Sequence, residues 1–158
     1  MTAVLFTNAK VLDVEAGKLV PDQTVHVSGG RIKRVSPQRP KVAKSTRVID
    51  LKGKVLMPGL CDGHVHVTAI TPDFSALARY SPFYTAARSA DVLDGMLMRG
   101  FTTVRDAGGA DYGLAKAVDE GYMRGPRILF CGKALSQTGG HGDVRAAGEN
   151  FTFEGCFC

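Results

Sequence analysis

The sequence predicts an α/β protein in which a β-rich segment, residues 1–57, precedes an alternating α/β segment, residues 58–158. Short apolar runs separated by tight turns fill the first segment, and this spacing is typical of β-hairpins. Strand-like and helix-like patterns alternate in the second segment, which favours a parallel sheet with crossover helices. Polar side chains follow each predicted strand of that sheet, where α/β enzymes place their chemistry.

The β-rich segment shows strand periodicity with turn signals between the strands. Residues 25–27 alternate as Val-His-Val, a Ser-Gly-Gly turn occupies 28–30, and a returning strand begins at 32–35. A further strand is expected at 46–51. The alternation turns His26 away from its valine neighbours, so we interpret it as a surface residue. The segment has too few apolar positions to form a core alone, and we expect it to need partner strands.

The second segment alternates between the two periodicities. Gly100 stands where a glycine often ends a helix, and Asp111 can cap the start of the next helix. In order, we expect a strand leading into residues 64–67, a loop over 71–82, a helix over 86–99, a strand over 101–106, a helix over 111–121 and a strand over 127–131.

A His-x-His pair follows the first strand of this segment, after a Pro-Gly bend. Side chains alternate along a strand, so His64 and His66 share one face, with Cα atoms about 6.5–7 Å apart. Two imidazoles at that separation can bind one metal ion with bonds of about 2.0–2.1 Å. Asp62 shares the face and can hydrogen-bond a ligand. An isolated pair of this kind is more often two half-exposed histidines, but the strand and Pro-Gly context favours the metal site.

Composition excludes several classes of partner. Nine of the 20 Lys and Arg residues lie between Arg31 and Lys54 against one acid, Asp50, without aromatic residues to stack a base, so we expect a solvated surface and no nucleic acid. Neither a signal peptide nor an apolar run of about 20 residues is evident, so no membrane is expected. Four unevenly spaced cysteines indicate a reduced, cytoplasmic setting.

Several of these stretches resemble one known family. Residues 54–66, Lys-Val-Leu-Met-Pro-Gly-Leu-Cys-Asp-Gly-His-Val-His, resemble the metal-binding signature of the amidohydrolase superfamily. Residues 100–106 and 125–129 look like its second and third barrel strands. Residues 138–143, Thr-Gly-Gly-His-Gly-Asp, are similar to the branch with Xaa-Pro dipeptidase-like and imidazolonepropionase-related proteins. The final residues, 150–158, match nothing we recognise.

The resemblance implies a β-sandwich segment followed by a (β/α)₈ TIM-type barrel with one or two divalent metals, zinc being expected. It carries metal ligation onto His64 and His66. The remaining ligands of the family follow later strands, and a (β/α)₈ barrel takes about 250 residues. Residues 58–158 are therefore expected to form only the first three strands, an incomplete barrel. Lys133 is a weak candidate for the carboxylated lysine of the family.

The implied activity is metal-dependent hydrolysis of C–N bonds, by a dipeptidase-like enzyme or an N-acyl amino acid amidohydrolase that uses a metal-activated water. The substrate is then a small amide or dipeptide, and His141 either binds it or stabilises its own loop. Asp106 is either structural, together with Arg105, or supports the metal ligands from behind, as Asp62 can. A cyclic-amide hydrolase, a deaminase and a truncated, non-catalytic fragment remain alternatives. The 158 residues alone are expected to be inactive, and a homo-oligomer stays open.

Overall fold

The computed structural model describes residues 3–143 and 145–150. The chain is a mixed α/β protein that divides into two compact units, Met1–Pro58 and Gly59–Cys158. Within the described residues no helix is long and apolar enough to cross a membrane. The closely spaced cysteines Cys156 and Cys158, which the sequence favours as unliganded thiols, lie outside the described residues.

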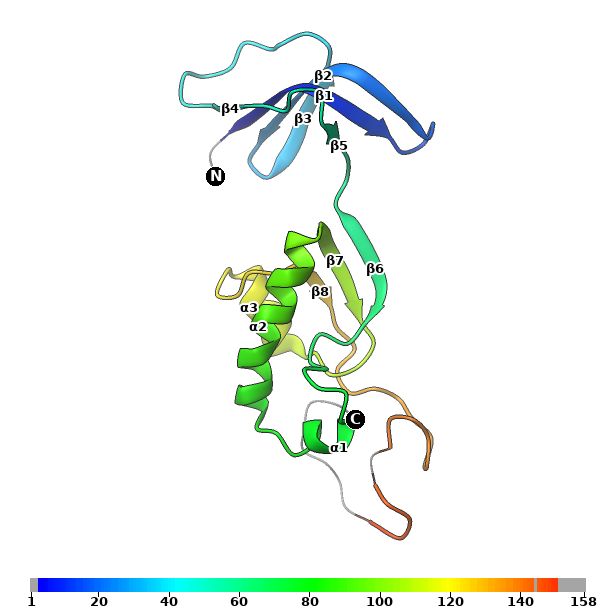
Figure 1. Ribbon diagram of the computed structural model, residues 1–158. Helices are drawn as coiled ribbons and strands as arrows, with labels where there is room; N and C mark the ends of the chain where they lie inside the picture. The colour runs from blue at the N-terminus through cyan, green and yellow to red at the C-terminus, as the bar shows by residue number, and fades with distance from the viewer. Residues whose placement is uncertain (1–2, 144, 151–158) are drawn as a thin grey trace. The chain divides into compact units, whose positions relative to one another are not determined.

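The first unit contains one five-stranded sheet (Figure 1). Its antiparallel ladder has the order β3-β2-β1, and both β4 and β5 pair with β1 in parallel. The sheet is therefore mixed, rather than the succession of hairpins that the sequence predicts. The strands are β1 (Val4–Asp13), β2 (Lys18–Ser28), β3 (Arg31–Ser36), β4 (Arg47–Asp50) and β5 (Val55–Leu56).

The hairpin between β2 and β3 is confirmed. Its turn contains Gly29 and Gly30 with φ of 61° and 72°, a conformation that favours glycine. β1 and β2 are longer than the short strands expected, because Asn8 and Asp22, with φ of 53° and 54°, form irregularities within the strands. Polar residues that often mark turns thus act here as bulges.

One face of this sheet stays open. Leu5 and Ala9 are fully buried, whereas Ile32 is 68% exposed and Val35 is 48% exposed. An apolar hollow of about 280 Å³ lies on the open face, and it is lined by Phe6, Val11, Leu12, Val25, Val27, Ile32, Val35, Leu56, Met57 and Pro58. The unit therefore exposes apolar surface that a small sheet normally buries against another layer.

The second unit contains a parallel sheet of order β6-β7-β8, with α2 and α3 on one side of it (Figure 1). The alternation predicted from the sequence is confirmed. Its elements are β6 (Leu60–Val65), α1 (Phe74–Leu77), α2 (Pro82–Met98), β7 (Phe101–Asp106), α3 (Tyr112–Asp119) and β8 (Arg127–Leu129). Strands and helices share one core of Val65, Val67, Leu93, Val104, Ala110, Leu114, Ala115 and Ile128.

The helices differ from the prediction in two respects. α2 begins at Pro82, four residues before the expected start at 86, because proline fits the first helical position, where no amide partner is needed. A short helix, α1, also forms inside the predicted 71–82 loop, capped by the Asp73 carboxylate that accepts from Ala76 N. Asp111 caps α3 as predicted, accepting from Leu114 N at 2.9 Å.

Glycines follow the ends of three elements. Gly100 (φ 96°) follows α2 and Gly121 (φ 82°) follows α3, as predicted. The third strand ends at Leu129, two residues earlier than expected, and Gly132 (φ 81°) turns the chain just beyond it. The shorter strand leaves residues 130–143 as a loop at the sheet edge.

Two further glycines are required by close packing. A side chain at Gly59 would overlap Thr102, and a Cβ at Gly125 would lie 2.8 Å from Leu93 Cβ. The Pro-Gly bend before β6 thus lets the strand lie directly against β7. Gly125 lets the turn before β8 approach α2.

Candidate functional site

The carboxyl ends of β6, β7 and β8 carry three loops that are hydrogen-bonded to one another. Ala107 N donates to Val65 O at 2.9 Å, joining the β6 and β7 ends. Gly109 N donates to Gly132 O at 2.8 Å, and Gly132 N donates to Ala110 O at 3.0 Å, joining the β7 and β8 loops. The polar clusters predicted after the strands therefore share one edge of the sheet.

His64 and His66 lie side by side at this edge. Their ring centroids are 5.2 Å apart and their planes are inclined by 79°. Val65, between them, is 7% exposed and belongs to the core, whereas His64 is exposed and His66 is half-buried. The strand alternation thus turns both imidazoles away from the core, as the sequence predicts.

The His66 ring is held by the β7 loop. Its Nδ1 lies 3.0 Å from Gly108 O. A carbonyl only accepts, so Nδ1 carries the proton in this bond, and in the neutral ring Nε2 carries the lone pair. Metal-binding histidines usually donate their other ring N–H to a carboxylate, a backbone carbonyl or water, and the bond to Gly108 O is one of these arrangements.

Asp62 contacts the main chain at the end of β6. Its Oδ1 accepts from His64 N at 3.1 Å. The carboxylate therefore holds the backbone that presents His64. Arg105 acts on the same strand, because its Nε donates to Gly63 O at 2.7 Å.

Asp106 and its neighbour Arg105, which the sequence analysis groups together, make separate contacts. Asp106 is fully buried. Its Oδ2 accepts from Val67 N at 2.7 Å, and its Oδ1 accepts from Gly108 N and Ala110 N, both at 3.0 Å. The carboxylate thus joins the β6 loop to the β7 loop through three backbone amides.

Gly108 is a site residue that the sequence analysis does not single out. The available signal was the spacing Asp106-x-Gly108, since Asp often accepts from the amide two residues on. That pattern predicts the turn, although not the histidine that its carbonyl meets.

His141 lies in the loop after β8 and is exposed. Its ring meets Phe74 of α1 edge-on, with centroids 5.4 Å apart. Asp143 stabilises this loop: it accepts two 2.7 Å bonds from the Arg145 guanidinium and a 2.9 Å bond from Gly139 N. These bonds, chiefly those from Arg145, lower the pKa of Asp143 well below its ordinary range.

Within the part of the chain that the structure describes, no third His, Cys, Asp or Glu joins the His64–His66 pair in a metal-binding group. His141 therefore lies on the same edge of the sheet without completing a ligand set. Two nitrogen ligands are fewer than the three or so that protein zinc sites use.

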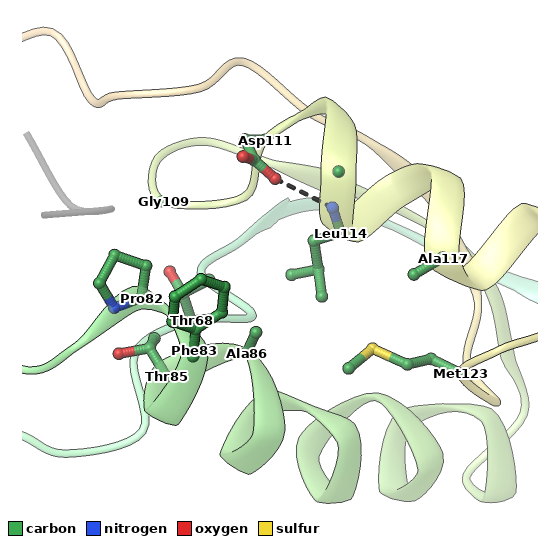
Figure 2. Close-up of a pocket in the computed structure, with 11 residues that line it drawn as sticks. Thr68, Pro82, Phe83, Thr85, Ala86, Gly109, Asp111, Leu114, Ala117 and Met123 are labelled. Atoms are coloured by element: carbon green, nitrogen blue, oxygen red, sulfur yellow. Dashed lines mark hydrogen bonds between the residues drawn. The ribbon is translucent and has the colours of Figure 1, made fainter.

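An apolar pocket of about 280 Å³ lies between the first turns of α2 and α3 (Figure 2). Figure 2 shows the Asp111 carboxylate bonded to Leu114 N, so this acid is used as a helix cap. The pocket can hold an apolar group but offers no histidine. It is lined by Thr68, Pro82, Phe83, Thr85, Ala86, Gly109, Asp111, Gly113, Leu114, Ala117 and Met123.

The sequence pattern of the Amidohydrolase family matches residues 55–154, and the chain belongs to this family. Among curated proteins it is 40% identical to an ochratoxinase from Aspergillus niger over 100 residues, which is 60% of this chain and 21% of that protein. It is 38% identical to adenine deaminase 3 from Rhizobium meliloti over 61 residues, 38% of this chain and 10% of that protein. The matched part of the chain thus spans about a fifth of the ochratoxinase and about a tenth of the adenine deaminase.

Solved structures give a similar result over more of the chain. A prolidase complexed with N-methylphosphonate-L-proline matches 96% of this chain and 37% of its own, with 44% identity and a TM-score of 0.90. A Xaa-Pro dipeptidase with bound methionine matches 95% of this chain and 39% of its own, with 25% identity and a TM-score of 0.77. The chain therefore shares its fold with part of both solved structures, at 44% and at 25% identity.

Proposed function

We propose that this chain carries the first metal ligands of a metal-dependent hydrolase that cleaves C–N bonds in small amides or dipeptides. The observation that supports the proposal most is the His64–His66 pair, with rings 5.2 Å apart at the carboxyl edge of a parallel sheet. The match of the Amidohydrolase family to residues 55–154 supports the same class of enzyme.

The donor atoms fit a divalent ion, and we propose zinc. Imidazole nitrogen suits zinc, and the bond between His66 Nδ1 and Gly108 O favours the tautomer in which Nε2 carries the lone pair that a metal ion needs. The further ligands would come from other parts of the protein. When bound, the ion supplies an activated water and polarises the scissile carbonyl.

We further propose that each of the two units forms part of a larger structure, a β-sandwich for the first unit and a (β/α)₈ barrel for the second. The open apolar face of the first unit suits a second sheet, giving a β-sandwich, and the β6-β7-β8 sheet suits the start of a (β/α)₈ barrel. The match to 37% of the prolidase chain at a TM-score of 0.90 supports this interpretation.

Two residues of this chain have proposed roles beside the metal. Asp62 fixes the His64 amide and so the strand end that presents the imidazole. His141 contacts the substrate, at its scissile carbonyl or its carboxylate. Its exposed ring, at the same sheet edge and packed against Phe74, supports this role.

For the substrate we favour Xaa-Pro dipeptides and N-acyl amino acids. The resemblance to the prolidase and to the Xaa-Pro dipeptidase supports this class. A deaminase is the second candidate, supported by the 38% identity to adenine deaminase 3. The exposed free thiols of Cys61 and Cys131 support a reducing, cytoplasmic location.

The test uses the protein at its full encoded length, with the double variant His64→Ala/His66→Ala and with His26→Ala, a histidine of the first unit, as the matched control. We expect bound zinc, measured by elemental analysis, to fall from near-stoichiometric to background in the double variant only. Hydrolysis of acyl-amino acids and Xaa-Pro dipeptides should fall at least ~10³-fold with it, because the activated water is lost. Unchanged zinc in the double variant contradicts the proposal, and turnover of adenine but not of amides favours the deaminase.

A further inference from the structure

Asp106 is the one fully buried acid among the described residues, and it accepts hydrogen bonds from three backbone amides. Removing a carboxylate from water is costly unless strong hydrogen bonds replace the lost hydration. Three charge-assisted bonds of 2.7–3.0 Å provide that replacement here. A neutral side chain could join the same loops without this desolvation cost. The role of the carboxylate therefore depends on which three amides it holds.

Two of the three amides lead directly to His66. Val67 N belongs to the residue that follows His66, and Asp106 Oδ2 holds it at 2.7 Å. Gly108 N is held by Oδ1 at 3.0 Å, and the carbonyl of the same Gly108 accepts from His66 Nδ1 at 3.0 Å. One carboxylate thus fixes both the main chain beside His66 and the group that orients its ring.

The loop after β8 fixes the Gly108 carbonyl from the other side. The peptide that contains this carbonyl also contains Gly109 N, which donates to Gly132 O at 2.8 Å. A chain of hydrogen bonds therefore runs from Gly132 through one peptide group to the imidazole, and such chains polarise each member in the same sense.

Packing removes the remaining freedom of Gly108. A Cβ added there would lie 2.6 Å from Ala134 Cβ and 3.2 Å from Ala134 Cα. Real Cβ atoms do not approach so closely, so any larger residue must move the β7 loop away from Ala134. Gly108 is therefore needed for its small size.

From these contacts we propose that Asp106 and Gly108 are positioning residues that aim the His66 imidazole at the metal, without touching the ion themselves. This inference rests on the proposed function, in which His66 is a metal ligand. Partners of this kind behind a metal-binding histidine typically change metal affinity about 10- to 100-fold when they are replaced.

The test measures metal binding in the full-length protein separately from its stability. The variants are Asp106→Asn, which keeps the shape but puts an NH₂ group against at least one amide donor, and Gly108→Ala. Leu93→Ala is the control: Leu93 is fully buried in the same core and lies against Gly125, at the turn before β8. The readouts are zinc affinity by chelator competition, the visible absorption spectrum of the Co²⁺-loaded protein, and the thermal midpoint.

We expect Asp106→Asn and Gly108→Ala to weaken zinc binding at least ~10-fold and to change the Co²⁺ spectrum. Leu93→Ala should lower the thermal midpoint while leaving both metal readouts at the wild-type values. If the two loop variants lower the midpoint as Leu93→Ala does but leave affinity and spectrum unchanged, the two residues are merely structural and the inference is overturned.

A compensating change tests the steric part and serves even if Asp106→Asn does not fold. Gly108→Ala combined with Ala134→Gly removes the 2.6 Å contact, so zinc affinity should recover at least in part. No recovery overturns the role assigned to Gly108. His66→Ala in the same titration separates the two proposals: unchanged affinity there refutes the metal site itself, whereas a large loss there without one in Asp106→Asn refutes only the positioning.

Discussion

Both units contain a carboxylate that accepts hydrogen bonds from backbone amides, exposed to solvent in the first unit and buried in the second. In the first unit Asp13 accepts from Glu15 N at 3.1 Å and Ala16 N at 3.0 Å, in an exposed turn between β1 and β2. In the second unit Asp106 accepts from three amides and is fully buried. Water can replace the Asp13 carboxylate as a partner but cannot reach the amides around Asp106. Burial therefore determines how much the fold depends on each acid.

The largest expected effect compares these two acids directly. Asp106→Ala leaves three buried amides without an acceptor, and at about 1–3 kcal/mol each we expect a loss of roughly 3–9 kcal/mol in the free energy of unfolding of the second unit. Asp13→Ala should cost a small fraction of this. Urea denaturation followed by circular dichroism measures both, and similar losses for the two variants would refute the role of burial.

A second contrast concerns glycines. Gly29 in the first unit has φ of 61° and nothing within 4 Å of an added Cβ, whereas Gly125 in the second unit meets Leu93 Cβ at 2.8 Å. Gly29→Ala should cost about 1 kcal/mol through backbone strain, and Gly29→Asn less, because Asn tolerates this conformation. Gly125→Ala should cost about 1–3 kcal/mol through overpacking, and Gly125→Asn more.

The order of the Asn and Ala variants is the check on that contrast. In thermal or urea unfolding of the four variants, we expect Asn to be more stable than Ala at position 29 and less stable than Ala at position 125. The same order at both positions would mean that one cause, strain or packing, acts at both.

The smallest expected effect is a pH dependence limited to loops in each unit. Asp143, bonded chiefly to Arg145, and Asp50, bonded chiefly to the Lys52 amide, both have lowered pKa values. Because the folded pKa lies below the unfolded value of about 3.9, the stabilisation is complete above that value and is lost as pH falls through the folded pKa. Amide shifts of Gly139 and Lys52, followed by NMR, should stay constant above about pH 4 and change only below it. A change centred at pH 4 or higher would contradict these contacts.

Local patterns were sufficient to predict most elements of the second unit. The run from Phe101 to Asp106 forms β7 as predicted, because β-branched residues are bounded by glycines on both sides. The start of α2 was misplaced because Pro82 signals both a loop and a first helical turn. In the first unit, Asn8 and Asp22 extended strands as bulges, a choice that depends on pairing with distant residues.

The sequence predicted only those features of the site that depend on neighbouring residues. Period-two alternation was enough to put His64 and His66 on one side of the chain. The bond from His66 to Gly108 joins residues 42 positions apart, and the bond from Asp106 to Val67 joins residues 39 apart. Such contacts depend on parallel pairing of β6 with β7, so no pattern within either strand contains them.

We propose that His64 and His66, at the carboxyl edge of the second unit, bind the metal. X-ray absorption at the zinc edge of the purified full-length protein tests it most directly. We predict at least two imidazole nitrogens at about 2.0–2.1 Å from zinc, and a smaller imidazole contribution in His66→Ala. A zinc shell without imidazole scattering, or one that His66→Ala leaves unchanged, would contradict the account.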